Sequence, residues 1–456
     1  MLLKPQFKGV ALLAHGLDTG MMDWGITRWK KELADIKAMG ADTLWYAPIQ
    51  FGRCHANDLA ERSPFLQLRV AIGKAALASD LKVGVFLGLN DIFSETWAVH
   101  PDWHADNSSL CLEEGEVCPQ APGAWSEVLR LRAKLFAALP RIDHLFVPPT
   151  DYGGCACERC DPWARQYLRL YEEQAALCRR YHPRAKIVAS AYGLPLRQVD
   201  MIRADLRFAD WVDYVVDVPR GCGKGVIKFY MAPEITMVGG WGRQGPAPVL
   251  EQIRRLYRAE GKAVVGVMPY SEGIHDDVNR FACLAFAANP ERTCQDVAAE
   301  YARKWLGLSG ADVSRVAKTI VGLGKDVTLD VTSAAYLDPD RGCRNPHADW
   351  RVEVLMAARK RQPALIDNYR YWLLHYRAVI EALNVVRGTL DPGILCAEAE
   401  LCLQGFERLE PAYAGFLMKS GSHKGLRQTW VVKRTFHAAW RRERRLERTA
   451  NVHLKV

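Results

Sequence analysis

Residues 26–47, ITRWKKELADIKAMGADTLWYA, show a helix pattern followed directly by a strand pattern. Apolar side chains recur at helical spacing at Ile26, Trp29, Leu33 and Ile36. Gly40 then signals the end of the helix, and the apolar run at 43–47 predicts a buried strand. This stretch therefore predicts one helix-to-strand unit of an α/β fold.

The same alternation continues along the chain to about residue 290. Short apolar runs predict strands at 10–14, 43–47, 83–89, 144–148, 186–192, 211–217, 235–239 and 263–268. Helical patterns follow most of these runs, which indicates a parallel sheet. Eight such units are typical of a (β/α)₈ TIM barrel. A doubly wound open sheet is the alternative, but no strand is followed by a G-x-G-x-x-G dinucleotide loop.

Strand patterns nearly vanish after about residue 290, and long helical patterns replace them. These patterns fill residues 294–325, 348–388 and 395–415. We therefore predict three parts: a catalytic barrel at 1–290, a helical domain at 291–418 and a basic C-terminal helix or tail at 419–456. The helical domain also offers a surface for a homodimer.

The composition is that of a folded globular protein. Of 456 residues, 49% are hydrophobic and 25% are charged. The net charge of +9 lies in residues 419–456, which hold eleven Lys or Arg and two Glu, while the rest holds 50 of each sign. No nucleic-acid interface is therefore expected on the body of the protein. No apolar run reaches the ~20 residues of a membrane span.

The cysteines bear on localisation. The chain has 13 cysteines, and most of them are scattered within helix and strand patterns. Such cysteines are typically buried small apolar residues. This usage favours a reducing, cytoplasmic environment. A signal peptide that had been removed would leave no trace in this numbering.

One group of cysteines has a distinct spacing. Cys155, Cys157 and Cys160 form C-x-C-x₂-C, and Cys111 or Cys118 could complete a set of four. Thiolates at such short spacing suit structural zinc. Free thiols, or a disulfide to Cys111 or Cys118, remain open alternatives.

Polar and aromatic residues gather where the predicted strands end, which is where barrel enzymes place their active sites. Carboxylates among Tyr, Trp, His and Asn are typical of a sugar-binding site. Asp151 and Glu272 directly follow strands and are our catalytic pair, because glycoside hydrolysis needs two carboxyl groups; Asp91 and Asp217 are the reserves. No cofactor is expected for catalysis. The predicted substrate-binding residues are His15, Tyr46, Arg53, Asn90, Asp91, Tyr152, Tyr192, Asp217, Trp241 and Tyr270.

Several segments carry a family resemblance. ITRWKKELADIKAMGADTLWY resembles barrel glycosidases of the hexosaminidase and α-glucuronidase neighbourhood. HPDWHA, LCLEEGEVC and PPTDYGGCACERC together resemble a largely uncharacterised bacterial family of glycoside-hydrolase-like barrels. YSEGIHDDVNRFACLAFAANPERTCQDVAAEYARKWLG is similar to that family's passage from the eighth strand into its helical domain.

The resemblance covers roughly residues 8–310 and implies a carbohydrate-active barrel, with Asp151 and Glu272 at positions of motif carboxylates. The chain departs from family 20 hexosaminidases, which have an adjacent Asp-Glu pair after strand four. Here Tyr152 follows Asp151. The substrate-assisted mechanism of that family therefore does not carry over.

The function expected from the sequence is a glycoside hydrolase that removes a terminal sugar, with an acidic or N-acetylated sugar favoured. Arg53, Arg220 and Arg243 follow predicted strands and suit an acidic sugar. A non-catalytic carbohydrate-binding barrel is the first alternative. The second is a metal-dependent hydrolase or lyase that uses His15, His55 and Asp91.

Overall fold

The computed structural model describes residues 7–12, 21, 24–106, 115–150, 153–216, 222–230, 248–260, 264–271, 274–323, 348–383 and 389–418. The chain divides into two compact units. The first comprises Met1–His15, Trp24–Phe229 and Glu260–Pro269. The second comprises Gly16–Asp23, Tyr230–Ala259 and Tyr270–Val456.

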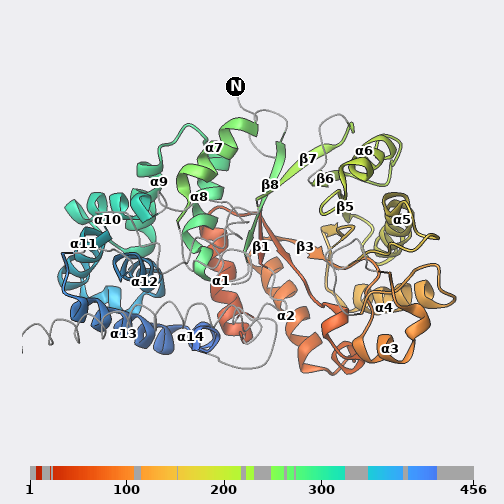
Figure 1. The fold of residues 1–456 in the computed structure, drawn as a ribbon, viewed down its shortest axis with the longest axis horizontal. Coiled ribbons are helices and arrows are strands. Elements are labelled where there is room, and N and C mark those ends of the chain that lie inside the picture. The colour runs from red at the N-terminus through yellow and green to blue at the C-terminus, as the bar shows by residue number, and fades with distance from the viewer. Residues whose placement is uncertain are drawn as a thin grey trace, which may run out of the picture. The chain divides into compact units, whose positions relative to one another are not determined.

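A closed β-barrel forms the centre of the first unit, with its strands in sequence order (Figure 1). The strands are β1 Phe7–Leu12, β2 Thr43–Tyr46, β3 Lys82–Phe86, β4 His144–Phe146, β5 Lys186–Ser190, β6 Tyr214–Val216, β7 Gly225–Tyr230 and β8 Val264–Ser271. Each consecutive pair from β1 to β7 is parallel. The predicted α/β barrel followed by helices is confirmed.

Helices of the first unit alternate with these strands. They are α1 Ile26–Ala38, α2 Pro64–Ala78, α3 Ser94–Val99, α4 Ala124–Ala138, α5 Trp163–Tyr181 and α6 Leu196–Asp205, with short 3₁₀ turns η2 Phe51–Arg53, η3 Ala56–Leu59 and η4 Pro101–Trp103. The apolar stripe expected on α1 is buried, because Trp29, Leu33 and Ile36 have no exposed surface. Burying side chains of this size stabilises the fold by about 1.5–3 kcal/mol each.

Two neighbouring aromatic residues of β2, Trp45 and Tyr46, point to opposite faces of the barrel sheet. Trp45 lies level with Gly84 on β3, and a side chain at Gly84 would meet the Trp45 ring at 2.3 Å. Trp45 also packs against His144 and Phe146 of β4, with ring centroids 5.1 and 6.4 Å apart. Since successive strand residues face opposite sides, Tyr46 points the other way, toward α2. Its hydroxyl donates a hydrogen bond to the carbonyl of Arg69 on that helix, at 3.2 Å.

The position of the seventh strand corrects a prediction. We predicted it at 235–239, which lies outside the described residues, whereas β7 is Gly225–Tyr230. Its register with β6 pairs Tyr214 with Gly225 and Val216 with Ile227. Residues 235–239 contain no charged residue, while β7 contains Lys228 and begins with glycine, so local composition favoured the wrong segment. Pairing with β6 decides the strand instead.

The second unit is helical in its described part. Its elements are α7 Leu250–Glu260, η7 Ile274–Asp276, α8 Asp277–Ala288, α9 Cys294–Leu306, α10 Gly310–Leu323, α11 Ala348–Arg361, η9 Pro363–Asp367, α12 Tyr369–Leu383, α13 Pro392–Leu409 and α14 Pro411–Met418. Capping explains the bounds of α9: the Thr293 hydroxyl accepts from the Asp296 amide, and Gly307 ends the helix at φ 67°. Among the described helices, none has the length and apolarity needed to cross a membrane.

Candidate active site at the strand ends

The segment that leaves β4 is fixed by three side chains. The Trp163 indole donates to the carbonyl of Pro149 at 2.7 Å, and the Tyr167 hydroxyl donates to that of Val147 at 2.8 Å. Thr150 donates its hydroxyl hydrogen bond to the carbonyl of Tyr192 at 2.9 Å. Asp151 and Tyr152 follow immediately and lie outside the described residues. The backbone that leads into Asp151 is thus held by α5 and by the loop after β5.

Gly193 is required for that contact between the loops after β4 and β5. Its φ is +70°, and a Cβ there would lie 2.0 Å from the Thr150 hydroxyl oxygen. Any side chain would be strained by the backbone conformation and would also displace Thr150. No motif in the sequence marks this glycine.

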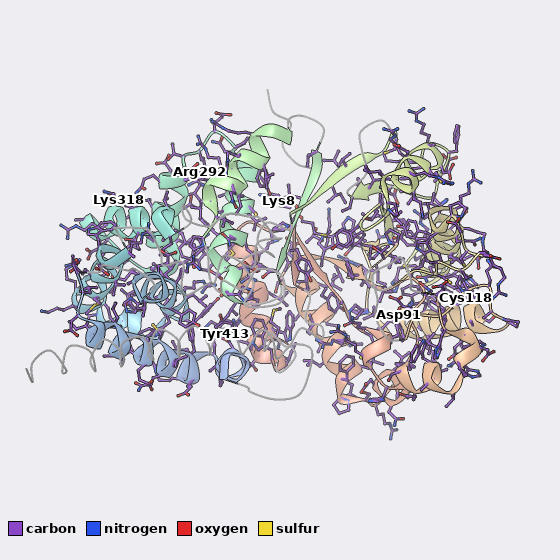
Figure 2. The ribbon with its side chains drawn as sticks, viewed as in Figure 1. Lys8, Asp91, Cys118, Arg292, Lys318 and Tyr413 are labelled. Carbon is purple, nitrogen blue, oxygen red and sulfur yellow. The ribbon has the colours of Figure 1, made fainter. Side chains whose placement is uncertain are left out.

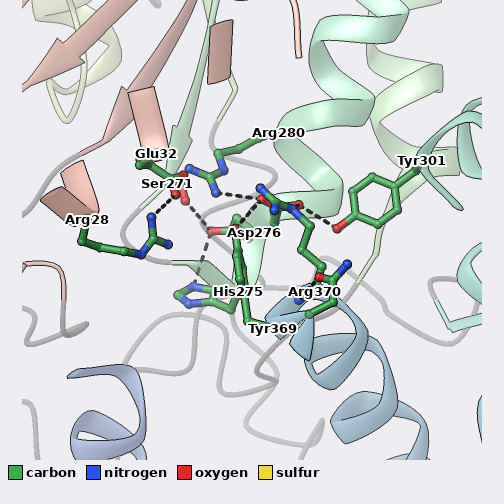
Figure 3. Close-up of polar contacts among 11 residues, drawn as sticks. Arg28, Glu32, Ser271, His275, Asp276, Arg280, Tyr301, Tyr369 and Arg370 are labelled. Atoms are coloured by element: carbon green, nitrogen blue, oxygen red, sulfur yellow. Dashed lines mark hydrogen bonds and ion pairs between the residues drawn. The ribbon is translucent and has the colours of Figure 1, made fainter. Parts of the chain in front are cut away.

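The segment that leaves β8 is also held by buried polar contacts, within the second unit (Figure 3). The Ser271 hydroxyl donates to the Asp276 carboxylate at 3.3 Å. The next residue, Asp277, accepts from the hydroxyls of Tyr301 at 2.6 Å and Tyr369 at 3.2 Å, and from Arg370 Nε at 2.8 Å. Glu272 lies outside the described residues. The preceding residue, Ser271, is therefore held by Asp276, which directly precedes the buried contacts of Asp277.

Two predicted site residues after β3 are fully engaged in structural contacts. Asp91, which is labelled in Figure 2, pairs with the buried Arg132 and accepts the amide of Phe51 at 3.0 Å. Both its carboxylate oxygens are therefore occupied. Asn90 donates to the carbonyls of Val117 at 2.6 Å and Gly154 at 2.9 Å. These side chains brace loops. We therefore assign neither of them to the sugar or to catalysis.

The end of β2 and the loop after it contain two predicted site residues, Tyr46 and Arg53, and one further candidate, Gln50. The Tyr46 side chain is buried against α2, away from the barrel interior, and burial raises the pKa of its hydroxyl. Tyr46 is therefore a packing residue, while Arg53 is exposed at the end of η2. Gln50 is 9% exposed, and neither polar atom of its amide has a partner among the described residues. A buried amide without partners is costly, which makes Gln50 a ligand-binding candidate that we did not predict.

The remaining predicted contacts are placed as follows. Tyr192 is half-buried and Tyr270 is buried. His15, Asp217 and Trp241 lie outside the described residues, as do Arg220 and Arg243. The prediction for Trp241 depends on a seventh strand at 235–239, whereas β7 is Gly225–Tyr230.

Four cysteine thiols come together, one from the segment between η4 and α4 and three from the loop after β4. Cys118, Cys155, Cys157 and Cys160 place their sulfur atoms within 4.8 Å of one another. Cys118 lies near α4 (Figure 2). Hydrogen bonds with Cys155 and Cys160 lower the pKa of the Cys118 thiol well below its usual value. In the part of the chain that the structure describes, this is the one group of three or more ligand residues with such proximity.

The alternative metal set of His15, His55 and Asp91 gains no support from the described geometry. His55 is exposed and pairs with Glu95 at 2.7 Å. Asp91 is committed to Arg132 and the Phe51 amide. His15 lies outside the described residues.

Comparison with known proteins supports the fold. No family model matches the sequence, and no curated protein matches it. Among solved structures, a GH138 enzyme targeting pectin rhamnogalacturonan II aligns with a TM-score of 0.52 and 10% identity, over 96% of this chain and 77% of that one. A family 89 glycoside hydrolase from Clostridium perfringens, in complex with PUGNAc, aligns with a TM-score of 0.54 and 10% identity. That alignment covers 95% of this chain and 59% of the other. At this identity the likeness establishes a shared fold.

Proposed function

We propose that this protein is a glycoside hydrolase that uses Asp151 and Glu272 as its pair of catalytic carboxyl groups. The observation that carries the proposal is the position of their neighbours: Thr150 follows β4 and Ser271 ends β8, at the carboxyl ends of barrel strands. Barrel enzymes place their active sites at this end. The likeness to two glycoside hydrolases over nearly the whole chain is consistent with this chemistry, although a fold alone does not define a function.

The two carboxyl groups have complementary tasks in such a reaction. One protonates the oxygen of the leaving group, and the other acts as base or nucleophile at the sugar carbon. Loops that are fixed by hydrogen bonds favour this chemistry, because both carboxyl groups must keep a defined position relative to the glycosidic bond. The contacts of Thr150 and Ser271 fix the residues directly before each carboxylate.

The proposed substrate is a terminal sugar, with an acidic or N-acetylated residue favoured. Gln50 adds a buried amide that can donate to and accept from sugar hydroxyls. Arg53 is exposed in the same loop and suits a substrate carboxylate.

The test is hydrolysis of a panel of 4-nitrophenyl α- and β-glycosides that includes glucuronides and N-acetylhexosaminides. We expect turnover on one sugar class, and a fall in kcat of about 10²–10⁴-fold in both Asp151→Asn and Glu272→Gln. Asp205→Asn, an exposed carboxylate at the end of α6, is the matched control and should retain full activity. Turnover that survives in both amide variants would show that the pair is misassigned. Sugar binding without any turnover would point to a binding protein instead.

A further inference from the structure

The four clustered cysteines join two segments that are distant in sequence. Cys118 lies in the segment between η4 and α4, and Cys155, Cys157 and Cys160 lie in the loop that follows β4. The Cys118 sulfur lies 3.7 Å from that of Cys157 and 3.8 Å from that of Cys160. Three of these residues are buried, and Cys157 is half-buried. Nothing in the proposed sugar chemistry uses them.

These separations match a tetrahedral metal site. Zinc–thiolate bonds of about 2.3 Å at tetrahedral angles place neighbouring sulfur atoms about 3.8 Å apart. A disulfide requires sulfur atoms about 2.05 Å apart. Each of the four thiols is free in the structure.

We propose that Cys118, Cys155, Cys157 and Cys160 bind one zinc ion in a closed tetrathiolate site. Zinc is the expected ion, because four thiolates in tetrahedral array are a standard structural zinc ligand set. Four protein ligands leave no open position for water or substrate. The site is therefore structural.

Backbone hydrogen bonds hold the cysteine ligands in position. The carbonyl of Cys157 accepts the amides of Cys160 at 2.8 Å and of Asp161 at 3.1 Å, which folds Cys157–Cys160 into a tight turn. This turn brings two thiols of a C-x₂-C pair to the same side. The Cys118 amide is held by the carbonyl of Trp103 at 2.6 Å, so the fourth ligand is fixed independently.

Charge near the cluster also fits a bound zinc. Four thiolates around Zn²⁺ leave a net charge of about −2 on the site. Arg159 lies within the turn, and its guanidinium is 3.9 Å from the Cys118 sulfur. This cation offsets part of the negative charge.

The zinc ion would fasten the loop that leads from Asp151 to α5. Asn90 already links the same two segments, through Val117 and Gly154. The metal would add a second link, one residue further along each segment. Its loss should loosen the segment next to the proposed catalytic residue.

Metal content of the full chain tests the site directly. Purified protein analysed by elemental mass spectrometry should hold one zinc per chain, and Cys118→Ser and Cys157→Ser should hold almost none. Cys178→Ser is the matched control, since Cys178 is buried on α5 outside the cluster and its loss should leave the zinc in place. Unchanged zinc in the ligand variants would overturn the assignment, and so would iron in its place.

Measurements on the unmodified chain keep the test decisive if a variant fails to fold. Chelation should remove the zinc and lower Tm, and added zinc should restore it. Cobalt in place of zinc should give the intense visible absorption of a tetrahedral thiolate site. An intact mass two hydrogens below that of the reduced chain would identify a disulfide and overturn the proposal. Glycoside turnover plays no part in these readouts, so they are independent of the proposed function.

Discussion

At the scale of single residues, burial and pairing distinguish structural from functional polar groups. The sequence predicts Asp91, at a strand end, as an alternative catalytic carboxylate. In the structure, the buried Arg132 and the Phe51 amide engage both its carboxylate oxygens. Gln50 lies in the loop after the neighbouring strand with its amide unpartnered among the described residues. Burying an amide without hydrogen-bond partners costs free energy. A ligand that completes the hydrogen bonds of Gln50 would offset this cost.

Replacing Gln50 with leucine tests this distinction. The change removes the hydrogen bonds of the amide at nearly constant size, so we expect KM to rise about tenfold, as one lost hydrogen bond of about 1.5 kcal/mol implies. The fold should be kept or slightly stabilised, because an unpaired buried amide is removed. Steady-state kinetics and a thermal melt check both. A loss of Tm with unchanged KM would make Gln50 a structural residue.

At the scale of elements, one carboxylate connects three helices of the second unit. Asp277 begins α8 and contacts Tyr301 of α9 as well as Tyr369 and Arg370 of α12. These contacts fix the start of α8. Tyr301 and Tyr369 are buried aromatic residues, which periodicity alone assigns to the core without revealing their hydroxyl partners.

Asp277→Asn should destabilise the protein by about 3–5 kcal/mol, because it leaves the buried Arg370 without its counter-charge. Asp312→Asn is the matched control. Asp312 pairs with Arg361, which is about half exposed, and breaking such a pair costs about 1 kcal/mol or less. Denaturant unfolding of both variants measures the difference. Equal losses would show that the Asp277 network adds nothing beyond a surface ion pair.

At the scale of the whole molecule, buried histidines make stability depend on pH. Burial lowers the pKa of His144, inside the barrel, to about 4, with a smaller effect of Lys82. Burial and the charge of Arg280 lower the pKa of His275 to about 3. Below about pH 6.5 the unfolded chain binds protons that these native histidines do not. Acid therefore favours unfolding, and this stability is fully present only above the unfolded pKa.

The free energy of unfolding should fall by about 1.4 kcal/mol per pH unit for each of the two histidines between about pH 6 and pH 5. Denaturant titrations across this range measure the slope. His144→Gln, which cannot titrate, should reduce the slope by about half, because His275 still titrates. A slope that is identical in the unmodified protein and in His144→Gln would exclude His144 as its source.

Much of the fold could be predicted from the sequence. The helix stripe of 26–36, the alternation of strands and helices and the helical second half are local patterns that the structure retains. The carboxylates chosen as catalytic remain predictions, while Tyr46, Asn90 and Asp91 serve packing and loop bracing. Sequence reasoning could place these residues near strand ends, but it could not show which way each side chain points.

The sequence by itself determined the periodicity of the elements and the short cysteine spacing, because both follow from the backbone geometry of neighbouring residues. The tertiary structure decided which segment pairs as β7, that Trp45 faces the barrel interior while Tyr46 faces α2, and that Cys118 joins Cys155, Cys157 and Cys160. It also brought Arg132 to Asp91. These outcomes depend on strand register and on contacts between residues tens of positions apart, whose energies no local pattern contains.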